Sequence, residues 1–294
     1  MSSFLVSRRS TDNLYDAVSE TSAAVVIRRY SSSFGLASRL LAKPVRTHVR
    51  NAYALVRVAD EIVDNPDPGL DREARDRMLT WLQEDVRQAL ATGYSANLVV
   101  HAFARTAIAC GIDAGLVDPF FASMRTDLDT TVHTPATFDR YVYGSAEVVG
   151  LMCLRAFLTA DPAGDRSRDY DRLAPGARRL GAAFQKLNFV RDLAEDHDTL
   201  ERCYFPGLDV DRFDDADRDR ILDDIDGDLD AAAAVIADLP PGSRRAVRVA
   251  HATFAELATR LRATPAAEIR RTRVRVPDPV KLRLVAGALY GGKA

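Results

Sequence analysis

The sequence predicts an all-α protein folded as a single domain over residues 1–294. Three observations favour this class. No stretch alternates β-branched and polar residues for long enough to form a strand, and no hairpin dipeptide joins two such stretches. Apolar residues instead recur at helical intervals. The composition is also rich in Ala, Leu and Arg, which favour helices, so we expect about ten of them.

Turn signals divide the chain into segments of roughly 15 to 25 residues. Two apolar faces illustrate the helical spacing within these segments: Val45, Val49, Ala52, Val56 and Val63, and then Phe138, Val142, Ser145, Val149 and Met152. Pro44 suits the first turn of the first of these helices, and Thr137 suits the cap region of the second. None of the intervening segments is long enough to be a linker between domains.

Charge and cysteine usage exclude several classes of protein. Lys and Arg total 40 against 42 Asp and Glu, whereas nucleic-acid binding calls for a basic excess or patch. Cys110, Cys153 and Cys203 are too scattered for a disulfide framework or a zinc site. We therefore expect free thiols and no nucleic-acid partner. The five histidines are also dispersed, so a bound metal would need oxygen ligands.

The N-terminus lacks the apolar run of a signal peptide, and no apolar stretch approaches the ~18 residues of a membrane span. We expect a cytoplasmic protein that could still contact a membrane surface peripherally. These features leave the oligomeric state open. The acidic stretch 209–230 is interpreted as a solvated helix face or a surface loop.

Two stripes of polar residues stand out on otherwise apolar helices. At ~100° per residue, the first stripe covers a sector roughly 60° wide and the second a sector roughly 80° wide, with nearly equal offsets. Their members are Tyr53, Arg57, Asp60 and Asp64, and then Gln185, Asn188, Asp192 and Asp196. The D-x-x-x-D spacing alone is weak, because the acidic stretch repeats it.

A cavity that holds metal ions and a polyanion would give these buried acids partners. Mg²⁺ takes carboxylate oxygens and keeps phosphates as its other ligands, while Arg57 and Arg191 offer forked donors to phosphate. The alternative is a buried salt bridge that joins the two helices, such as Arg57 to Asp196. Upstream, Ser31 and Ser33 either cap a helix or donate to a diphosphate oxygen.

Five blocks resemble those of the squalene and phytoene synthases, and are nearest to the bacterial phytoene synthases. They are R-Y-S-S-S-F-G-L-A-S-R-L-L, Y-A-L-V-R-V-A-D-E-I-V-D, M-R-T-D-L-D-T with Y-V-Y-G-S-A-E-V-V-G, Q-K-L-N-F-V-R-D-L-A-E-D, and R-V-R-V-P. The resemblance runs from about residue 14 to about residue 289. It implies one isoprenoid-synthase-type helical domain with a central catalytic cavity.

The resemblance also implies a set of site residues. Mg²⁺ (or Mn²⁺) would be held by Asp60, Asp64, Asn188, Asp192 and Asp196. The other catalytic positions would be Tyr53, Arg57, Arg191 and Tyr204. Prenyl diphosphate would contact Ser31, Ser33, Phe34, Tyr141, Val149, Gly150, Gln185, Asn188, Arg202 and Arg273.

Three departures from the family pattern bear on this site. The tail of the second aspartate motif is one residue longer and carries Glu201 in place of glycine, which leaves the register of Arg202 and Tyr204 open. Glu147 stands where relatives carry glycine, and it either alters product choice or points outward. Phe254 stands where relatives often carry Tyr, so we leave it off the predicted site.

The implied activity is head-to-head condensation of two geranylgeranyl diphosphates to phytoene through a cyclopropyl diphosphate, in carotenoid biosynthesis and without NADPH. Tyr53 or Tyr204 would assist proton loss. Farnesyl diphosphate is the alternative substrate, leading to squalene, dehydrosqualene or presqualene diphosphate. A more remote alternative is a non-catalytic assembly factor. Head-to-tail synthases usually have adjacent aspartates where this chain has Glu61.

Overall fold

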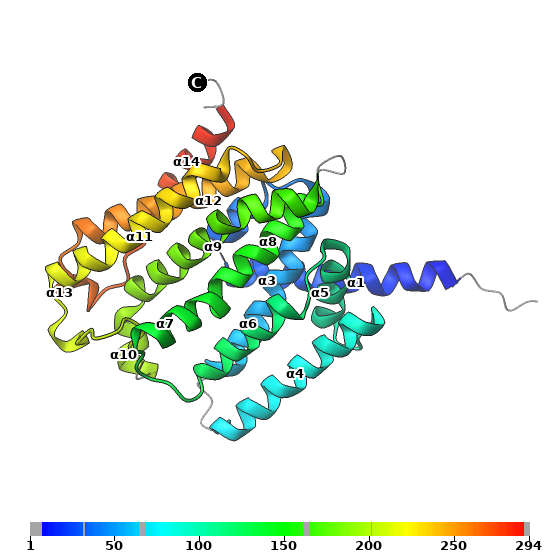
Figure 1. Cartoon of the computed structure of the whole chain (residues 1–294), viewed down its shortest axis with the longest axis horizontal. Coiled ribbons are helices and arrows are strands. Elements are labelled where there is room, and N and C mark those ends of the chain that lie inside the picture. The colour runs from blue at the N-terminus through cyan, green and yellow to red at the C-terminus, as the bar shows by residue number, and fades with distance from the viewer. Residues whose placement is uncertain (1–7, 32, 65–68, 161–164, 201, 291–294) are drawn as a thin grey trace, which may run out of the picture.

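The computed structural model consists of helices (Figure 1), and it describes residues 8–31, 33–64, 69–160, 165–200 and 202–290. The longer helices are α1 (Arg8–Tyr30), α3 (Lys43–Val63), α4 (Arg72–Thr92), α5 (Leu98–Cys110), α6 (Ala114–Thr126), α8 (Val148–Leu158), α9 (Arg166–Arg191), α11 (Asp215–Ile236), α12 (Pro241–Ala263) and α14 (Asp278–Tyr290). The shorter elements are α2 (Ser33–Ser38), α7 (Pro135–Val142), the π-helical turn η1 (Tyr143–Glu147), α10 (Leu193–Leu200), the 3-10 turn η2 (Val210–Arg212) and α13 (Ala266–Ile269).

The all-α prediction is confirmed. The described part of the chain contains no β-strand, and only an isolated bridge joins Val132 to Cys203. The same residues form fourteen α-helices rather than about ten. The excess comes from short helices such as α2 and α13, and from a break at Asp192. Asp192 leaves helical geometry with φ −101° and ψ 10°, so that α10 begins directly after α9.

Helix ends follow from local chemistry in the sequence. Pro44 lies in the first turn of α3, as predicted. Thr134 and Thr137 exchange hydrogen bonds in a capping box at the start of α7, which confirms the predicted cap region. Helices α4 and α5 end at Gly93 and Gly111, with φ of 76° and 73°. Glycine adopts this left-handed conformation without a Cβ clash.

Two apolar cores lie on either side of helix α9. One is formed mainly by α3, α4, α5, α6 and α8, and includes Leu55, Phe103 and Phe121. The other includes Leu187 and Ile225, and joins α9 to α7, α11 and α12. Helix α9 packs against α8 on one side and α11 on the other, as Figure 1 shows. This helix therefore carries its polar stripe at the boundary between the two cores.

Helices α7, η1 and α8 form one continuous helix from Pro135 to Leu158. By length and composition this helix could cross a membrane, with a mean hydropathy of 1.3 over its most apolar window. Within that window, however, 61% of the residues are buried inside the molecule. It packs against α6 and α9. Burial among other helices accounts for its apolar character.

The acidic stretch differs from the prediction at one position. Most of its acids lie on exposed faces, but Asp228 of α11 is only 1% exposed and accepts hydrogen bonds from Arg179 and Lys186 of α9. The prediction of a solvated helix face or surface loop therefore holds for most of these acids and is wrong for Asp228. A buried carboxylate needs charged partners, and Asp228 finds them on α9, so that it joins α11 to α9. The other acids of the stretch mostly face water instead.

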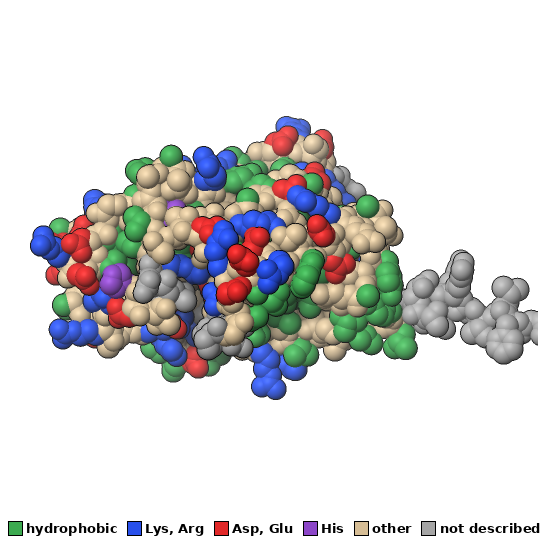
Figure 2. All heavy atoms as spheres, turned by 90° about the horizontal axis from the view of Figure 1, so that it is seen from below, with side chains coloured by type: hydrophobic (Ala, Val, Ile, Leu, Met, Phe, Trp, Pro, Cys, Tyr) green, Lys and Arg blue, Asp and Glu red, His purple; other side chains and the backbone are tan. Residues whose placement is uncertain are grey.

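The face seen from below carries mixed charge. Figure 2 shows acidic and basic side chains lying next to one another on this face, with hydrophobic side chains between them. Opposite charges that alternate at this spacing largely cancel beyond about one Debye length, ~8–10 Å. This face therefore presents no extended field of a single sign.

Candidate functional site

A cavity of about 1140 Å³ lies between the two cores and is lined by both polar stripes. Helices α3 and α8 form one side of it, and α9, α11 and α12 form the other. Polar side chains gather at the end where α3 stops and α9 breaks, and apolar side chains line the rest. Asp64 caps α3 and Asp192 caps α9, so both motifs place a carboxylate where a helix ends.

The first stripe is held together by contacts within α3 and to α1. Arg57 donates to Asp60 at 3.4 Å and pairs with Glu61, while its guanidinium lies 4.6 Å from the ring centre of Tyr30. Burial raises the pKa of Tyr53, against the lowering effects of Arg57 and of a hydrogen bond with Ser31. Arg57 is therefore held on its own helix and does not form the alternative salt bridge to Asp196.

In the second stripe, Asp192 is bonded by two arginines. Arg191 donates from Nε and Nη2 at 2.9 and 2.5 Å, and Arg273 from the loop after α13 donates from Nε and Nη2 at 2.8 and 3.2 Å. Arg273 also lies 3.5 Å from Glu195. The C-terminal block thus reaches the second aspartate motif, as its place in the predicted site requires.

Arg202 joins the first motif to the tail of the second. It is 7% exposed, and its Nη1 donates to Asp64 at 2.7 Å and to the Tyr204 hydroxyl at 3.3 Å. Its Nη2 donates to the main-chain carbonyl of Asp127 at 3.0 Å. In this register Tyr204 lines the cavity and Arg202 lies behind the lining, bonded to Asp64. Glu201 lies outside the described residues.

The electrostatics of this end are dominated by carboxylates. Burial, followed by repulsion from Asp64, raises the pKa of Asp60 to about 7. Burial, followed by the charges of Asp192 and Asp64, raises the pKa of Asp196 to about 7. Burial also raises the pKa of Asp127 to about 7, against the lowering effect of Arg202. The site therefore holds more negative charge than its arginines neutralise, which favours binding of cations or protons.

Among the described residues, no three or more His, Cys, Asp or Glu side chains converge closely enough to hold a metal ion. In this arrangement Asp64 and Asp192 are bonded to arginines instead. The donor set that faces the cavity is nevertheless all oxygen: Asp60, Asp64, Asp192 and Asp196, with Asn188 beside them. Such donors suit hard divalent cations rather than zinc.

The apolar part of the cavity depends on small residues and stacked rings. An added Cβ at Gly150 would lie 2.4 Å from the main-chain oxygen of Ala177, so the glycine lets α8 approach α9 closely. Phe184 of α9 and Phe254 of α12 stack with ring centres 3.8 Å apart. Both rings line the cavity, as does Val149. These walls make the interior of the cavity largely apolar.

The structure brings most of the predicted residues to one cavity. Its lining includes Ser31, Tyr53, Arg57, Asp60, Asp64, Tyr141, Val149, Gly150, Gln185, Asn188, Arg191, Asp192, Asp196, Tyr204 and Arg273. Arg202 lies directly behind this lining through its bond to Asp64. Ser33 and Phe34 begin α2, but their side chains lie outside the described residues.

The structure decides between the two alternatives for Glu147 and adds two residues to the predicted site. Glu147 accepts from Arg178 at 2.6 Å and is absent from the cavity lining, so it points outward. Phe254, which we had left off the predicted site, lies in the cavity wall. Asp127 was also missed, although it lines the cavity and is 5% exposed. Its place in the M-R-T-D-L-D-T block was the available signal.

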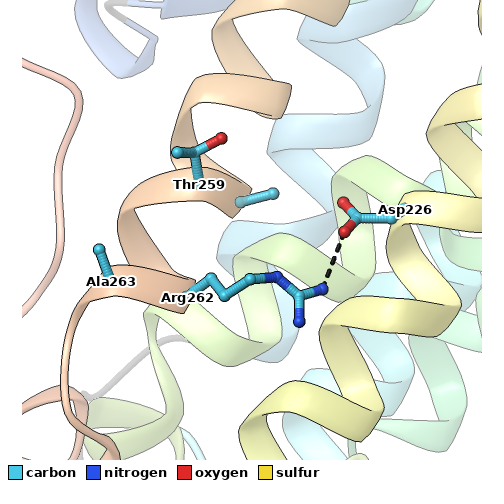
Figure 3. A pocket seen from close by; sticks show the side chains of 5 residues that line it. Asp226, Thr259, Arg262 and Ala263 are labelled. Carbon is cyan, nitrogen blue, oxygen red and sulfur yellow. Dashed lines mark hydrogen bonds and ion pairs between the residues drawn. The ribbon is translucent and has the colours of Figure 1, made fainter.

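A second, smaller pocket lies between α11 and α12 (Figure 3), where Asp226, Thr259, Arg262 and Ala263 surround about 290 Å³. The guanidinium of Arg262 donates to Asp226 at 2.8 Å and to Asp223 at the same distance. Since its charged groups are paired with each other, this pocket presents no unpaired charge to a ligand. The central cavity is therefore the candidate site.

An all-α domain whose cavity is charged at one end and apolar along the rest suits a ligand with an anionic head and an apolar tail. The chain belongs to the squalene/phytoene synthase family, whose model matches residues 27–279. It is 26% identical over 262 residues to the phytoene synthase of Pseudescherichia vulneris, covering 79% of each chain. It is 30% identical over 183 residues to the 15-cis-phytoene synthase of Enterobacter agglomerans, covering 60% of this chain and 58% of that protein.

A solved structure of a dehydrosqualene synthase in complex with a ligand has the same fold. It superposes with a TM-score of 0.77 at 18% identity, covering 93% of this chain and 96% of that one. Together with the family match, this likeness confirms the predicted fold and the predicted family. The family and its curated phytoene synthases support a prenyltransferase of the head-to-head type.

Proposed function

We propose that the chain condenses two geranylgeranyl diphosphates head to head into phytoene, with Mg²⁺ (or Mn²⁺), in carotenoid biosynthesis. The observation that carries this proposal is the shape of the cavity, which has carboxylates and arginines at one end and a long apolar shaft behind them. Such a shape would hold the diphosphate leaving group at the polar end and the hydrocarbon chains, which the reaction joins, in the apolar shaft.

The length of the shaft supports the C20 substrate. Lining residues on α9 run from Asn188 to Leu173, which at 1.5 Å per residue spans about 22 Å. With C–C bonds of about 1.5 Å, an extended geranylgeranyl chain measures about 19 Å and a farnesyl chain about 14 Å. The shaft therefore accommodates the longer chain in full, and the shorter chain would leave its far end empty.

The aspartates fit the proposed cations. Asp60 and Asp64 on one wall and Asp192 and Asp196 on the other would hold them, with Asn188 as a neutral oxygen donor. The raised pKa values of Asp60 and Asp196, both about 7, mark an excess of negative charge at this end of the cavity. When bound, divalent cations neutralise a diphosphate and make it a better leaving group.

The chain's own residues would bind, orient and shield the substrates. Arg57, Arg191 and Arg273 supply forked donors suited to diphosphate oxygens, and each now pairs with an aspartate or glutamate that cations would occupy or screen. Phe184 and Phe254 would exclude water, which would otherwise capture an allylic cation.

The reaction balances without a reductant. The allylic C–O bond of one substrate breaks, its diphosphate leaves with the electron pair, and the double bond of the second substrate attacks the cation. Loss of one proton closes a cyclopropane. The second diphosphate then leaves, the ring rearranges to a 1-1′ linked chain, and loss of a second proton forms the central double bond. Squalene formation would replace this last proton loss by hydride transfer from NADPH.

Product analysis of the purified protein tests the proposal. The protein is incubated with Mg²⁺ and either C15 or C20 diphosphate, with and without NADPH. We expect phytoene and two diphosphates from the C20 substrate without NADPH. Hydrocarbon that forms only with NADPH would indicate a squalene synthase. Turnover of the C15 substrate alone would indicate dehydrosqualene or presqualene diphosphate synthesis, and no turnover under any condition would support an assembly factor.

A further inference from the structure

Asp127 is a buried carboxylate outside both aspartate motifs. It follows the last turn of α6, is 5% exposed and lines the cavity. Its Oδ2 accepts from the Tyr141 hydroxyl at 2.9 Å, and its Oδ1 accepts from the Tyr204 hydroxyl at 3.4 Å. Helices α6 and α7 and the tail of the second motif therefore meet at this one side chain.

These bonds decide which way the two phenols face. Each phenol has a single proton, and an ionised carboxylate can only accept hydrogen bonds. One lone pair of the Tyr204 oxygen accepts from Arg202 at 3.3 Å. When both phenol protons point to Asp127, the remaining lone pairs of the two oxygens are left to face the cavity that the two rings line. Tyr141 and Tyr204 stack with ring centres 5.3 Å apart, and Phe189 stacks on Tyr204 at 4.0 Å. Packing thus restrains the rings while Asp127 sets the direction of their protons.

The hydrogen bonds of Arg202 do not involve the Asp127 carboxylate, which lies at ion-pair distance. Arg202 donates to the main-chain carbonyl of Asp127 at 3.0 Å and to Asp64 at 2.7 Å, whereas its separation from the carboxylate is 4.0 Å. Replacing Asp127 by Asn therefore preserves the hydrogen bonds of Arg202 and removes one negative charge at 4.0 Å from it. The amide keeps one accepting oxygen and offers N–H donors at the other position, so one of the two phenols would turn its own proton toward the cavity.

We propose that Asp127 is a positioning residue that orients Tyr141 and Tyr204 so that both present hydrogen-bond-accepting oxygens to the reacting end of the prenyl chains. This inference rests on the proposed function, in which that end carries positive charge and then loses protons. Oxygen lone pairs arranged in advance stabilise such charge, and an O–H donor at the same place would oppose it.

The test compares Asp127→Asn with Tyr141→Phe/Tyr204→Phe and with the combined triple variant, in the full chain. We expect Asp127→Asn to lower kcat by about 100- to 1000-fold, the range seen when a preorganised polar group is lost, with KM changed less than about 2-fold. If Asp127 acts only through the two tyrosines, Asp127→Asn should lower kcat by less than about 3-fold when it is added to Tyr141→Phe/Tyr204→Phe. Mn²⁺ and pyrophosphate binding, measured by calorimetry, should be retained in Asp127→Asn and lost in Asp64→Asn.

Three outcomes would overturn the inference: kcat near that of the parent, effects that multiply in the combined variant, or loss of Mn²⁺ binding in Asp127→Asn, which would make Asp127 a cation ligand.

A substrate-free measurement separates this inference from the proposed function. The ¹³Cζ resonances of Tyr141 and Tyr204 are assigned with Tyr141→Phe and Tyr204→Phe, and at least one of them should move in Asp127→Asn because that phenol changes from donor to acceptor. If neither resonance moved, the positioning role would be contradicted even if the wild-type protein proved inactive on prenyl diphosphates.

Discussion

At the residue scale, the four motif aspartates concentrate negative charge at one end of the cavity. Asp60 and Asp196 lie among like charges, whereas Asp64 and Asp192 are bonded to arginines. Replacing Asp60 or Asp196 relieves repulsion and desolvation and so costs the fold little, but replacing Asp64 or Asp192 takes a charged partner from an arginine. Substitution of these aspartates should therefore lower activity far more than it lowers stability.

We predict that Asp60→Asn, Asp64→Asn, Asp192→Asn and Asp196→Asn each lower turnover by at least about 100-fold, as expected when the stabilisation of a leaving group is lost. The melting temperature of the metal-free protein should fall little or rise for Asp60→Asn and Asp196→Asn, and should fall more for Asp64→Asn and Asp192→Asn, which take a charged partner from Arg202 and Arg273. The matched control is Asp230→Asn, an exposed acid on α11. Steady-state assays and differential scanning fluorimetry check both parts, and any motif variant that retained near-normal turnover would lose its proposed role.

Cation binding should depend on pH in a defined direction. The pKa values of Asp60 and Asp196 are raised to about 7 in the folded protein, against about 4 when unfolded. Between these values the metal-free folded state binds protons that the unfolded state does not, so its stability falls as pH rises from 4 to 7. A cation must displace those protons below pH 7 and meets free carboxylates above it.

The rise in melting temperature caused by Mn²⁺ should therefore be larger at pH 8 than at pH 6, and EDTA should abolish it. Zn²⁺ alone should not restore activity after EDTA, because the ligands are oxygens. Scanning fluorimetry at the two pH values, followed by assays after chelation and readdition of Mg²⁺ or Mn²⁺, measures these effects. A Mn²⁺ shift that is greatest at pH 6 would mean that the titrating acids do not bind the cation.

Periodicity predicted the residues of the site that lie on a single helix, such as Asp60 with Asp64. It could not identify Asp127 or Phe254, because their roles come from contacts across the fold. Asp127 meets Arg202, 75 positions away, and Phe254 meets Phe184 from another helix. Helical periodicity carries no signal for such contacts, and only the family resemblance of the M-R-T-D-L-D-T block pointed to Asp127.

At the element scale, the cavity depends on how closely α8 approaches α9. Gly150 makes this approach possible, because a Cβ there would lie 2.4 Å from a main-chain oxygen that cannot rotate away. Sequence periodicity predicted both helices, but not their separation, since the pattern of one helix says nothing of its distance from another. The break at Asp192 was missed for a similar reason, because the apolar spacing continues through it.

We predict that Gly150→Ala destabilises the protein by about 1–3 kcal/mol, the usual cost of overpacking, and lowers turnover because the cavity wall shifts. The control is Gly227→Ala in α11, where a Cβ meets nothing within 4 Å. This variant should gain about 0.5–1 kcal/mol from helix propensity and keep its activity. Urea unfolding followed by circular dichroism measures both, and equal effects of the two substitutions would show that α8 and α9 tolerate a wider spacing.

At the scale of the whole molecule, two apolar cores enclose a shaft instead of merging into one. Small side chains on three helices keep it open: Gly176 and Ala177 on α9, Ala232 on α11, and Ala250 on α12. The all-α class and the central cavity were predictable from helical spacing and family resemblance. The depth of the shaft was not, because it depends on which small residues face one another across it.

Chain-length selection should therefore respond to a single bulky residue at a chosen depth. Ala177 lines the shaft eleven positions before Asn188, which at 1.5 Å per residue places it about 16 Å from the polar end. That depth exceeds the roughly 14 Å of an extended farnesyl chain and falls short of the roughly 19 Å of a geranylgeranyl chain.

We predict that Ala177→Phe lowers kcat/KM for the C20 substrate by about 10- to 200-fold, the range seen for misfit in apolar pockets, and that it spares the C15 substrate. Leu173→Ala, at the far end, should leave C20 turnover intact. Competition assays with both diphosphates, analysed by chromatography of the hydrocarbons, give the ratio, and an equal loss for C15 and C20 would mean that the chains do not run along α9.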